Sequence, residues 1–127
     1  MKKILLIDDD EISLNAIESL LQRLEYTDVT SASDGMQALK LLDRMEHVFD
    51  VVITDVLMPE MDGFEIINDL LSRNFAGGVI LISGGDIKIR HLAKIYAANI
   101  NLNILTILNK PVTEHALVQA LESLPDK

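Results

Sequence analysis

The stretch that decides the fold is Ile4-Leu5-Leu6-Ile7-Asp8-Asp9-Asp10, in which four apolar residues end in three acidic ones. A short, unbroken apolar run of this kind is typical of a β-strand that is buried on both faces. Similar runs recur at Val51–Ile53, Val79–Ile82 and Ile104–Leu108, and a weaker one at 29–32 suits an edge strand. The sequence therefore predicts five strands.

The segments between these runs have the period of amphipathic helices, with apolar residues at steps of three and four. The apolar sets are Leu14, Ile17, Leu21 and Leu24; Met36, Leu39, Leu42 and Met45; Phe64, Ile67, Leu70 and Leu71; Ile89, Leu92, Ala93 and Tyr96; and Ala116, Leu117, Ala120, Leu121 and Leu124. Asp10, Asp34 and Thr113 are the expected helix caps. Strand and helix alternate five times, which predicts an α/β fold with parallel strands and helices on both faces.

Length and composition limit the class of protein. The 127 residues suit one domain, expected to span 1–124 with a tail or the start of a linker at 125–127. The formal net charge of -9 argues against binding nucleic acid or an anionic membrane. The chain has no cysteine, which excludes disulfides, thiolate metal sites and a cysteine nucleophile. Because no apolar run is long enough for a signal peptide or a membrane span, we expect a cytoplasmic domain.

Polar and charged residues follow the predicted strands where ligands of open α/β sheets bind, beyond the carboxyl ends. These residues are Asp8, Asp9, Asp55, Ser83 and Lys110. Carboxylates that lie close together repel each other, and a hard cation such as Mg²⁺ removes the conflict. A site with Mg²⁺ and a lysine beside a carboxylate suits phosphoryl transfer, in which the carboxylate can be the nucleophile.

Each of these residues alone has a simpler interpretation. An acidic run before a helix usually caps it, a role expected of Asp10, and a single lysine after a strand is usually a surface charge. The joint occurrence of the residues at successive strand ends favours the functional interpretation. The three histidines, His47, His91 and His115, lie on separate elements and are expected at the surface.

Asp8-Asp9, the segment Thr54–Gly63 (TDVLMPEMDG), Ser83 and Lys110-Pro111 together resemble the receiver domain of two-component response regulators. The resemblance covers nearly the whole chain, and the Met-Pro-x-Met-Asp-Gly part is its most specific motif. It implies a flavodoxin-like doubly wound sheet with five βα units and the strand order 2-1-3-4-5. Gly63 is expected to let the chain enter the third helix tightly.

The resemblance also assigns roles. Asp55 would accept a phosphoryl group from a sensor histidine kinase or a phosphotransfer protein, and Ser83 and Lys110 would bind its oxygens. The implied Mg²⁺ ligands are Asp8, Asp9, Asp55 and the backbone carbonyl of Leu57. The Lys110–Pro111 bond is expected to be cis. Such a domain is a signalling switch that catalyses its own phosphorylation and slow dephosphorylation, not a metabolic enzyme.

The sequence departs from the family pattern at Ile107, where most receivers have Tyr or Phe three residues before the lysine. The usual inward swing of a ring is therefore not expected, and Ile107 should stay packed. Residues 101–111 resemble receivers fused to EAL domains, which hydrolyse cyclic-di-GMP, although Asn101 and Thr106 replace the expected glycines. An EAL-type output domain is accordingly one expected partner.

A homodimer is also expected, through the face formed by the fourth helix, the fifth strand and the fifth helix. The densest basic cluster of this acidic chain falls there, with Lys88, Arg90, His91 and Lys94. A solvated helix face would explain the same cluster.

Two other functions fit part of the pattern. A phosphohydrolase of the haloacid dehalogenase type would use Asp8 and Asp10 as its Asp-x-Asp pair with Mg²⁺, but it leaves Asp55 and the following motif unexplained. A phosphate-independent pseudo-receiver would act only as a binding module, and the complete set of site residues argues against it. Turnover of a generic phosphatase substrate and uptake of a phosphoryl group distinguish the three functions.

Overall fold

Five strands and five helices alternate in the part of the chain that the computed structural model describes, residues 2–45, 49–56, 63–84 and 87–124. In chain order they are β1 (Ile4–Ile7), α1 (Glu11–Arg23), β2 (Val29–Ala32), α2 (Gly35–Met45), β3 (Val51–Asp55), α3 (Gly63–Ser72), β4 (Gly78–Ser83), α4 (Ile87–Ala98), β5 (Asn103–Asn109) and α5 (Glu114–Glu122). The predicted alternation is confirmed, and each predicted strand is present.

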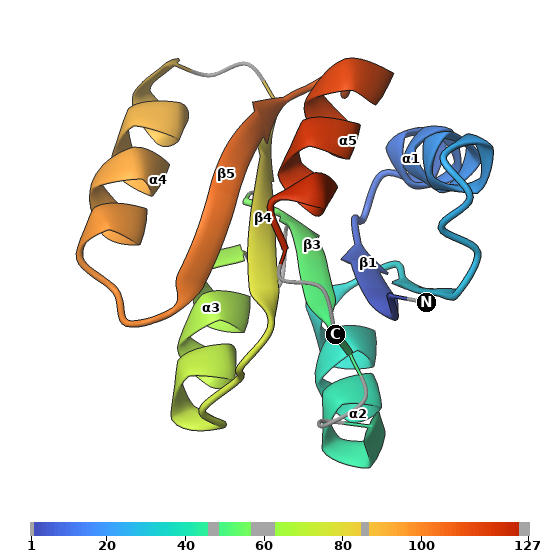
Figure 1. Ribbon diagram of the computed structural model, residues 1–127. Helices are drawn as coiled ribbons and strands as arrows, with labels where there is room; N and C mark the ends of the chain where they lie inside the picture. Colours follow the sequence, from blue (N-terminus) through green and yellow to red (C-terminus); the bar gives the residue numbers. More distant parts are fainter. Residues whose placement is uncertain (1, 46–48, 57–62, 85–86, 125–127) are drawn as a thin grey trace.

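The strands form one parallel sheet in the order β2-β1-β3-β4-β5 (Figure 1). This is the order that the resemblance to receiver domains implies, and the weak run at 29–32 is indeed an edge strand. Ile7 lies opposite Thr54, and Asp55 lies opposite Ile82. The carboxyl ends of the central strands therefore meet at one edge of the sheet.

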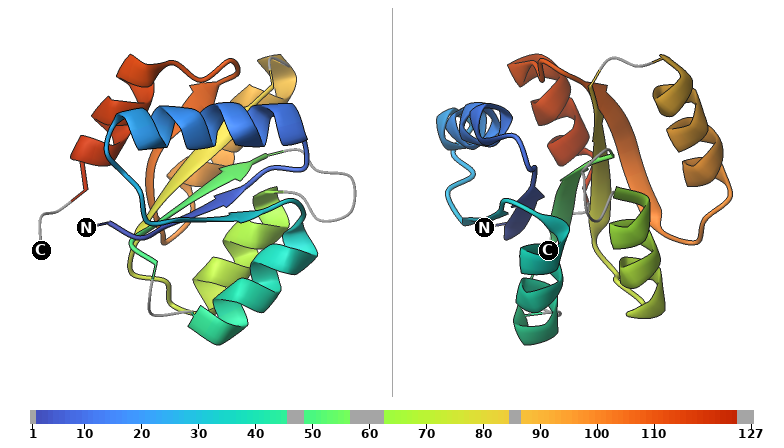
Figure 2. Two further views of the ribbon diagram at one scale, coloured as in Figure 1. Left: turned by 90° about the vertical axis from the view of Figure 1, so that its right-hand side faces the viewer. Right: turned by 180° about the vertical axis from the view of Figure 1, so that it is seen from behind.

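Helices cover both faces of the sheet, with α1 and α5 on one side and α2 and α3 on the other (Figure 2). Side chains alternate along β1, so that Leu5 and Ile7 join one apolar cluster with α2, α3 and α4, whereas Ile4 and Leu6 join a second cluster with α1 and α5. This alternation follows from the two-residue period of a strand. It explains why the central strands read as unbroken apolar runs.

The helix caps are the predicted ones. Asp10 accepts a hydrogen bond from the backbone N–H of Ile12 at 3.2 Å and begins α1. Asp34 accepts one from Gln37 at 2.8 Å, and Thr113 accepts one from Ala116 at 3.2 Å. Each of these side chains satisfies an N–H group that has no partner within its helix.

The outer edge at β5 and α4 is packed more loosely than the sequence predicts. The predicted apolar face of the fourth helix includes Leu92, but this side chain is 55% exposed, and only Ala93 of α4 is fully buried. Met36, predicted on the apolar face of α2, is exposed as well. Both helices exist where predicted, but neither of these side chains belongs to the two apolar clusters of the core. The pairing of β4 with β5 also contains a bulge, because Val79 lies opposite Ile104 whereas Ile80 lies opposite Thr106.

Among the described residues, no helix combines the length and the apolar character that crossing a membrane requires.

Candidate functional site

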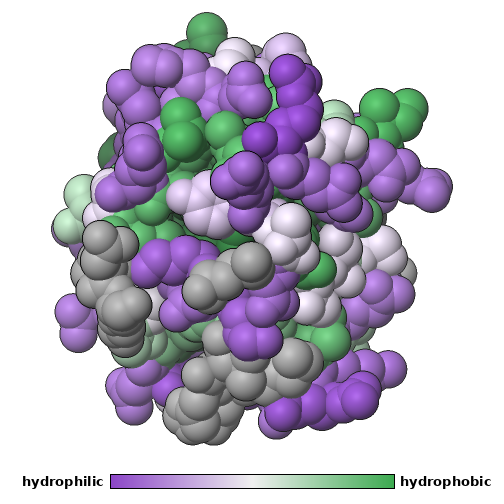
Figure 3. Space-filling view, turned by 45° about the vertical axis from the view of Figure 1, so that its right-hand side comes forward, coloured by the Kyte–Doolittle hydropathy of each residue, from purple (hydrophilic) through white to green (hydrophobic). Residues whose placement is uncertain are grey.

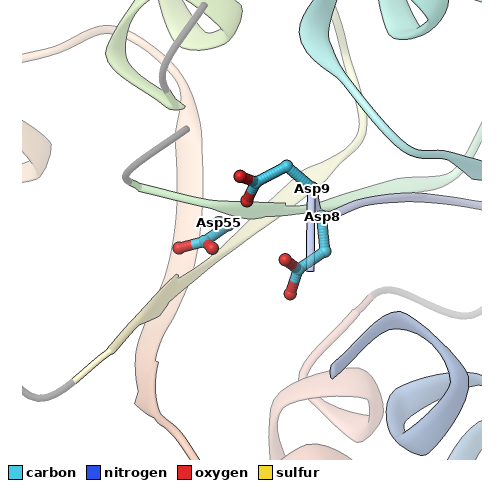
Figure 4. A group of neighbouring side chains, drawn as sticks. All are labelled: Asp8, Asp9 and Asp55. Carbon is cyan, nitrogen blue, oxygen red and sulfur yellow. The ribbon is translucent and has the colours of Figure 1, made fainter. Parts of the chain in front are cut away.

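Three carboxylates meet where β1 and β3 end (Figure 4). Asp8 and Asp9 directly follow β1, and Asp55 is the last residue of β3. One carboxylate oxygen of each lies within 4.8 Å of the others. Asp8 and Asp55 are buried and Asp9 is exposed, so the cluster opens to solvent on the side of Asp9.

Lys110 lies between the two buried carboxylates. Its Nζ is 2.9 Å from Oδ2 of Asp55 and 3.0 Å from Oδ2 of Asp8. Burial alone would lower the pKa of the Lys110 ammonium, but the hydrogen bonds to Asp55 and Asp8 outweigh it and raise that pKa above its ordinary value. Lys110 is thus a fixed positive charge beside Asp55 at neutral pH.

The donor set fits a hard divalent cation. One lysine cannot neutralise three carboxylates, although Lys110 pairs with both Asp8 and Asp55. Mg²⁺ prefers oxygen ligands and keeps several of its waters, which an open cluster with an exposed member allows. Asp8, Asp9 and Asp55 can therefore hold the ion. The fourth predicted ligand, the backbone carbonyl of Leu57, lies outside the described residues.

Ser83 ends β4 next to this cluster. Its side chain is 1% exposed, and its Oγ has no hydrogen-bond partner within the described ranges. A buried hydroxyl without a partner costs about 1–3 kcal/mol, which is tolerated where the group serves a ligand. The Ser83 carbonyl accepts a hydrogen bond from the backbone N–H of Lys110 at 2.9 Å, which joins the two site segments. The predicted cis bond at Lys110–Pro111 is present.

Other candidates lie away from the site or serve the fold. The Asp10 side chain also accepts a hydrogen bond from Ser13 Oγ at 2.9 Å, so both its oxygens are used in the cap of α1. Asp10 is therefore not placed to act as the second acid of the Asp8-x-Asp10 pair that a phosphohydrolase of the haloacid dehalogenase type would use. His91 and His115 are exposed as predicted, and His47 lies outside the described residues. Ile107 is partly buried against the cluster of the α4 side.

One residue with a structural role at the site, Thr54, was not predicted to have one, whereas the tight entry into the third helix at Gly63 was predicted. Thr54 is fully buried, and its hydroxyl donates to the Asp55 carbonyl at 3.1 Å. Gly63 begins α3 against the backbone of Asp55. The motif that contains both residues was recognised from the sequence, but both contacts are made to the Asp55 carbonyl, whose position a pattern of residue types does not show.

A shallow groove of about 180 Å³ lies beside the site, between α1 and the segment Lys110–Val112. On the α1 side it is lined by Ile12, Ala16 and Leu20, and Ile12 is 81% exposed. Figure 3 shows apolar areas in the upper half of this side, where α1 and α5 lie, enclosed by polar side chains.

The chain is a doubly wound α/β domain, and carboxylates, a hydroxyl and a lysine lie together at one edge of its sheet. Such a combination of fold and site is suited to phosphoryl chemistry. Residues 4–122 match the response regulator receiver domain, so the chain belongs to that family of two-component systems.

The individual similarities agree with this family. Two-component response regulator ORR22 of Oryza sativa subsp. indica is 42% identical over 81 residues, which is 64% of this chain and 11% of that protein. A response regulator receiver domain protein of Clostridium thermocellum is 31% identical with a TM-score of 0.80, covering 96% of this chain and 92% of that one. The chemotaxis protein CheY4 of Vibrio cholerae is 25% identical with a TM-score of 0.81, covering 98% of this chain and 99% of that one. The chain thus spans about a tenth of the length of the curated relative.

Proposed function

We propose that this domain is a phosphorylation switch in which Asp55 accepts a phosphoryl group from a phosphohistidine donor. The supporting observation is the environment of the Asp55 carboxylate, which lies 2.9 Å from Lys110 and within 4.8 Å of Asp8 and Asp9. Of the carboxylates in the cluster, it is the one in the centre of the sheet, between the metal ligands that follow β1 and the hydroxyl that ends β4.

The reaction transfers a phosphoryl group between two side chains. An oxygen of Asp55 forms the new O–P bond while the N–P bond to the donor histidine breaks and its electron pair stays on the imidazole. Asp8 and Asp9 would hold Mg²⁺ with Asp55, and the ion supplies positive charge to the phosphoryl oxygens. Lys110 pairs with one of these oxygens, and the Ser83 hydroxyl donates a hydrogen bond to another. The domain catalyses this transfer and also the slow hydrolysis of the aspartyl phosphate, in which water attacks phosphorus, inorganic phosphate is released and the Asp55 carboxylate is restored.

The donor protein approaches over the groove between α1 and Lys110–Val112. Exposure of an apolar side chain such as Ile12 to water is unfavourable in free energy, and burial against the apolar surface of a partner removes this penalty. Lys110, which pairs with Asp55, is one of the residues that line the groove, so a helix lying in it would carry its histidine close to Asp55. The partner that fits is a sensor histidine kinase or a phosphotransfer protein, and the exchange takes place in the cytoplasm.

The output surface is the face of α4, β5 and α5. On α4, Ile87, Leu92 and Ile95 are 83%, 55% and 50% exposed, among the basic residues Lys88, His91 and Lys94. This mixture suits a second copy of the domain or an output domain, of which an EAL-type domain is the one that the sequence favours. The proposed receiver unit spans 1–124, with a tail or the start of a linker at 125–127. A signal receiver domain of an HD domain-containing protein from Pseudomonas fluorescens Pf-5, 34% identical, shows that such units occur in larger proteins.

The test is incubation with a small phosphodonor and Mg²⁺, followed by intact mass measurement. We expect the mass of one phosphoryl group on the wild-type protein, none after removal of Mg²⁺ with a chelator and none on Asp55→Asn. A wild-type protein that takes up no phosphoryl group would be a phosphate-independent binding module. Sustained turnover of a generic phosphatase substrate would instead indicate a phosphohydrolase.

A further inference from the structure

Gly63, the first residue of α3, is pressed against the backbone of the proposed phosphoacceptor. A Cβ atom at this position would lie 2.6 Å from the carbonyl oxygen of Asp55 and 2.8 Å from Cα of Val56. Both distances are below 3.0 Å, a limit that real Cβ atoms essentially never cross. Because both neighbours are backbone atoms, no side-chain rotation relieves the contact. The N–H of Gly63 also donates to the carbonyl of Val56 at 2.8 Å.

The strand side of this contact is held in place. The N–H of Val56 donates to the carbonyl of Ile82 at 2.9 Å, and the Thr54 hydroxyl donates to the Asp55 carbonyl at 3.1 Å. The end of β3 is therefore fixed to β4 on one side and touches Gly63 on another.

The helix side is held as well. Ile66, Ile67 and Leu70 of α3 are fully buried in the apolar cluster beneath the sheet. Moving α3 outward would open space around these side chains, at a cost that grows with the volume opened. A side chain at position 63 must therefore displace the Asp55 peptide, the helix or both.

We propose that Gly63 is a positioning residue for the phosphoacceptor. The absence of a side chain lets α3 begin against the Asp55 carbonyl and so fixes the Asp55 carboxylate relative to Asp8, Asp9 and Lys110. A Cβ that reached an ordinary contact of 3.4 Å instead of 2.6 Å would open this junction by 0.8 Å. A displacement of about 1 Å at a reacting group can cost roughly 100-fold in rate. This inference rests on the proposed role of Asp55.

The chain offers a matched control at the opposite end of the same strand. A Cβ on Gly77 would lie 2.4 Å from the carbonyl oxygen of Asp50, the residue just before β3, and 2.6 Å from the ring of Phe75. Gly77→Ala therefore introduces the same kind of backbone clash as Gly63→Ala. The clash lies at the amino end of β3, whereas that of Gly63→Ala lies at the carboxyl end. If the clash only lowers the stability of the fold, both variants should behave alike at the site. If Gly63 positions Asp55, only Gly63→Ala should lose Mg²⁺ affinity and rate.

The experiment compares wild type, Gly63→Ala and Gly77→Ala in three measurements: urea unfolding, Mg²⁺ affinity by calorimetry, and the rate of phosphoryl uptake at increasing Mg²⁺ concentration. We expect both variants to be less stable. Gly63→Ala should bind Mg²⁺ about tenfold more weakly and should stay slower than wild type at saturating Mg²⁺, by roughly 10- to 100-fold. Gly77→Ala should match wild type in affinity and rate.

The inference is overturned if folded Gly63→Ala has wild-type Mg²⁺ affinity and rate, or if Gly77→Ala loses both to the same extent. If Gly63→Ala does not fold, Thr54→Val takes its place, because it removes the hydrogen bond to the Asp55 carbonyl with only a small change in side-chain size. It should weaken Mg²⁺ binding two- to threefold, and unchanged binding would count against the inference. A wild-type protein without phosphoryl uptake contradicts the proposed function, and the Mg²⁺ affinities still decide the role of Gly63.

Discussion

The centre of the sheet and its β5 edge differ in how firmly they are packed. Every residue of β1, β3 and β4 is buried, and the carboxylates, Ser83 and the Gly63 junction belong to these strands or directly adjoin them. In β5 only Leu108 is buried, and in the neighbouring α4 only Ala93 is. In Figure 1 the helix α4 lies on the left side of the molecule, with the strand β5 next to it.

The difference in packing suits two tasks of the proposed switch, holding the site and reporting its state. A close-packed region has little freedom to adjust, so it can hold carboxylates at distances that a cation and a phosphoryl group require. A region with few buried apolar contacts costs less free energy to rearrange, so it is the part that can report a change of state. Ser83 lies where the two regions meet, since it ends β4 and its carbonyl binds the Lys110 segment that follows β5.

The largest effect is expected at Asp55. Asp55→Asn should abolish phosphoryl uptake, because the amide is not a nucleophile and contributes no charge to the metal site. Leu92→Ala, on the exposed side of α4, should leave uptake within about twofold of wild type. Intact mass measurement at several times gives both rates. If Leu92→Ala were as inactive as Asp55→Asn, the two regions would not have separate tasks.

The second effect concerns the metal. Asp9→Ala should reduce Mg²⁺ affinity at least tenfold, since one of three charged ligands is lost. Without metal, the same variant should be slightly more stable, by less than ~1 kcal/mol, because Asp9 is exposed and its charge repels those of Asp8 and Asp55. Calorimetric titration and urea unfolding measure the two quantities. A titration that Asp9→Ala leaves unchanged would show that the cluster is not the metal site.

Core stability should follow the same division. Ile80→Ala in the fully buried β4 should lower the free energy of unfolding by about 2–5 kcal/mol, through lost burial and the cavity left behind. Leu92→Ala should change it by no more than about 0.5 kcal/mol. Equal losses in urea unfolding would mean that α4 is packed as firmly as the central strands.

The smallest effect is a shift within the edge region. Activation should displace the segment from Ser83 to Lys88, of which residues 85–86 lie outside the described residues, and the first turn of α4, while Ile107 keeps one rotamer. Ile107 is branched at Cβ and has no polar end that would favour solvent. Two structures, with and without Mg²⁺ and a phosphoryl mimic, provide the comparison. An unchanged segment or a flipped Ile107 would contradict this prediction.

Most of the fold could be predicted from the sequence, because buried parallel strands leave continuous apolar runs. The acidic cluster could be predicted as well, because the strand order places the ends of β1 and β3, which carry the acids, next to each other. The sequence did not predict that Leu92 and Met36 are exposed. The period of a helix shows which residues share a side, but not how much of that side the sheet covers. The contact between Gly63 and Asp55 joins backbone atoms, whose position depends on the whole strand–loop–helix path.

The bulge in β5 has a consequence for behaviour at high protein concentration. β5 is an edge strand of seven residues, four of them Ile or Leu, and an edge of this length and composition can add a strand from another molecule and so begin a fibre. Between Val79 and Ile80 of β4, the register shifts by one residue, and Leu105 is the extra residue on β5. A bulge bends the strand and increases its twist, which interrupts the flat row of N–H and C=O groups that an incoming strand needs. The irregular pairing thus protects the domain from the addition of a strand at the β5 edge, a contact different from a dimer formed through the face of α4, β5 and α5.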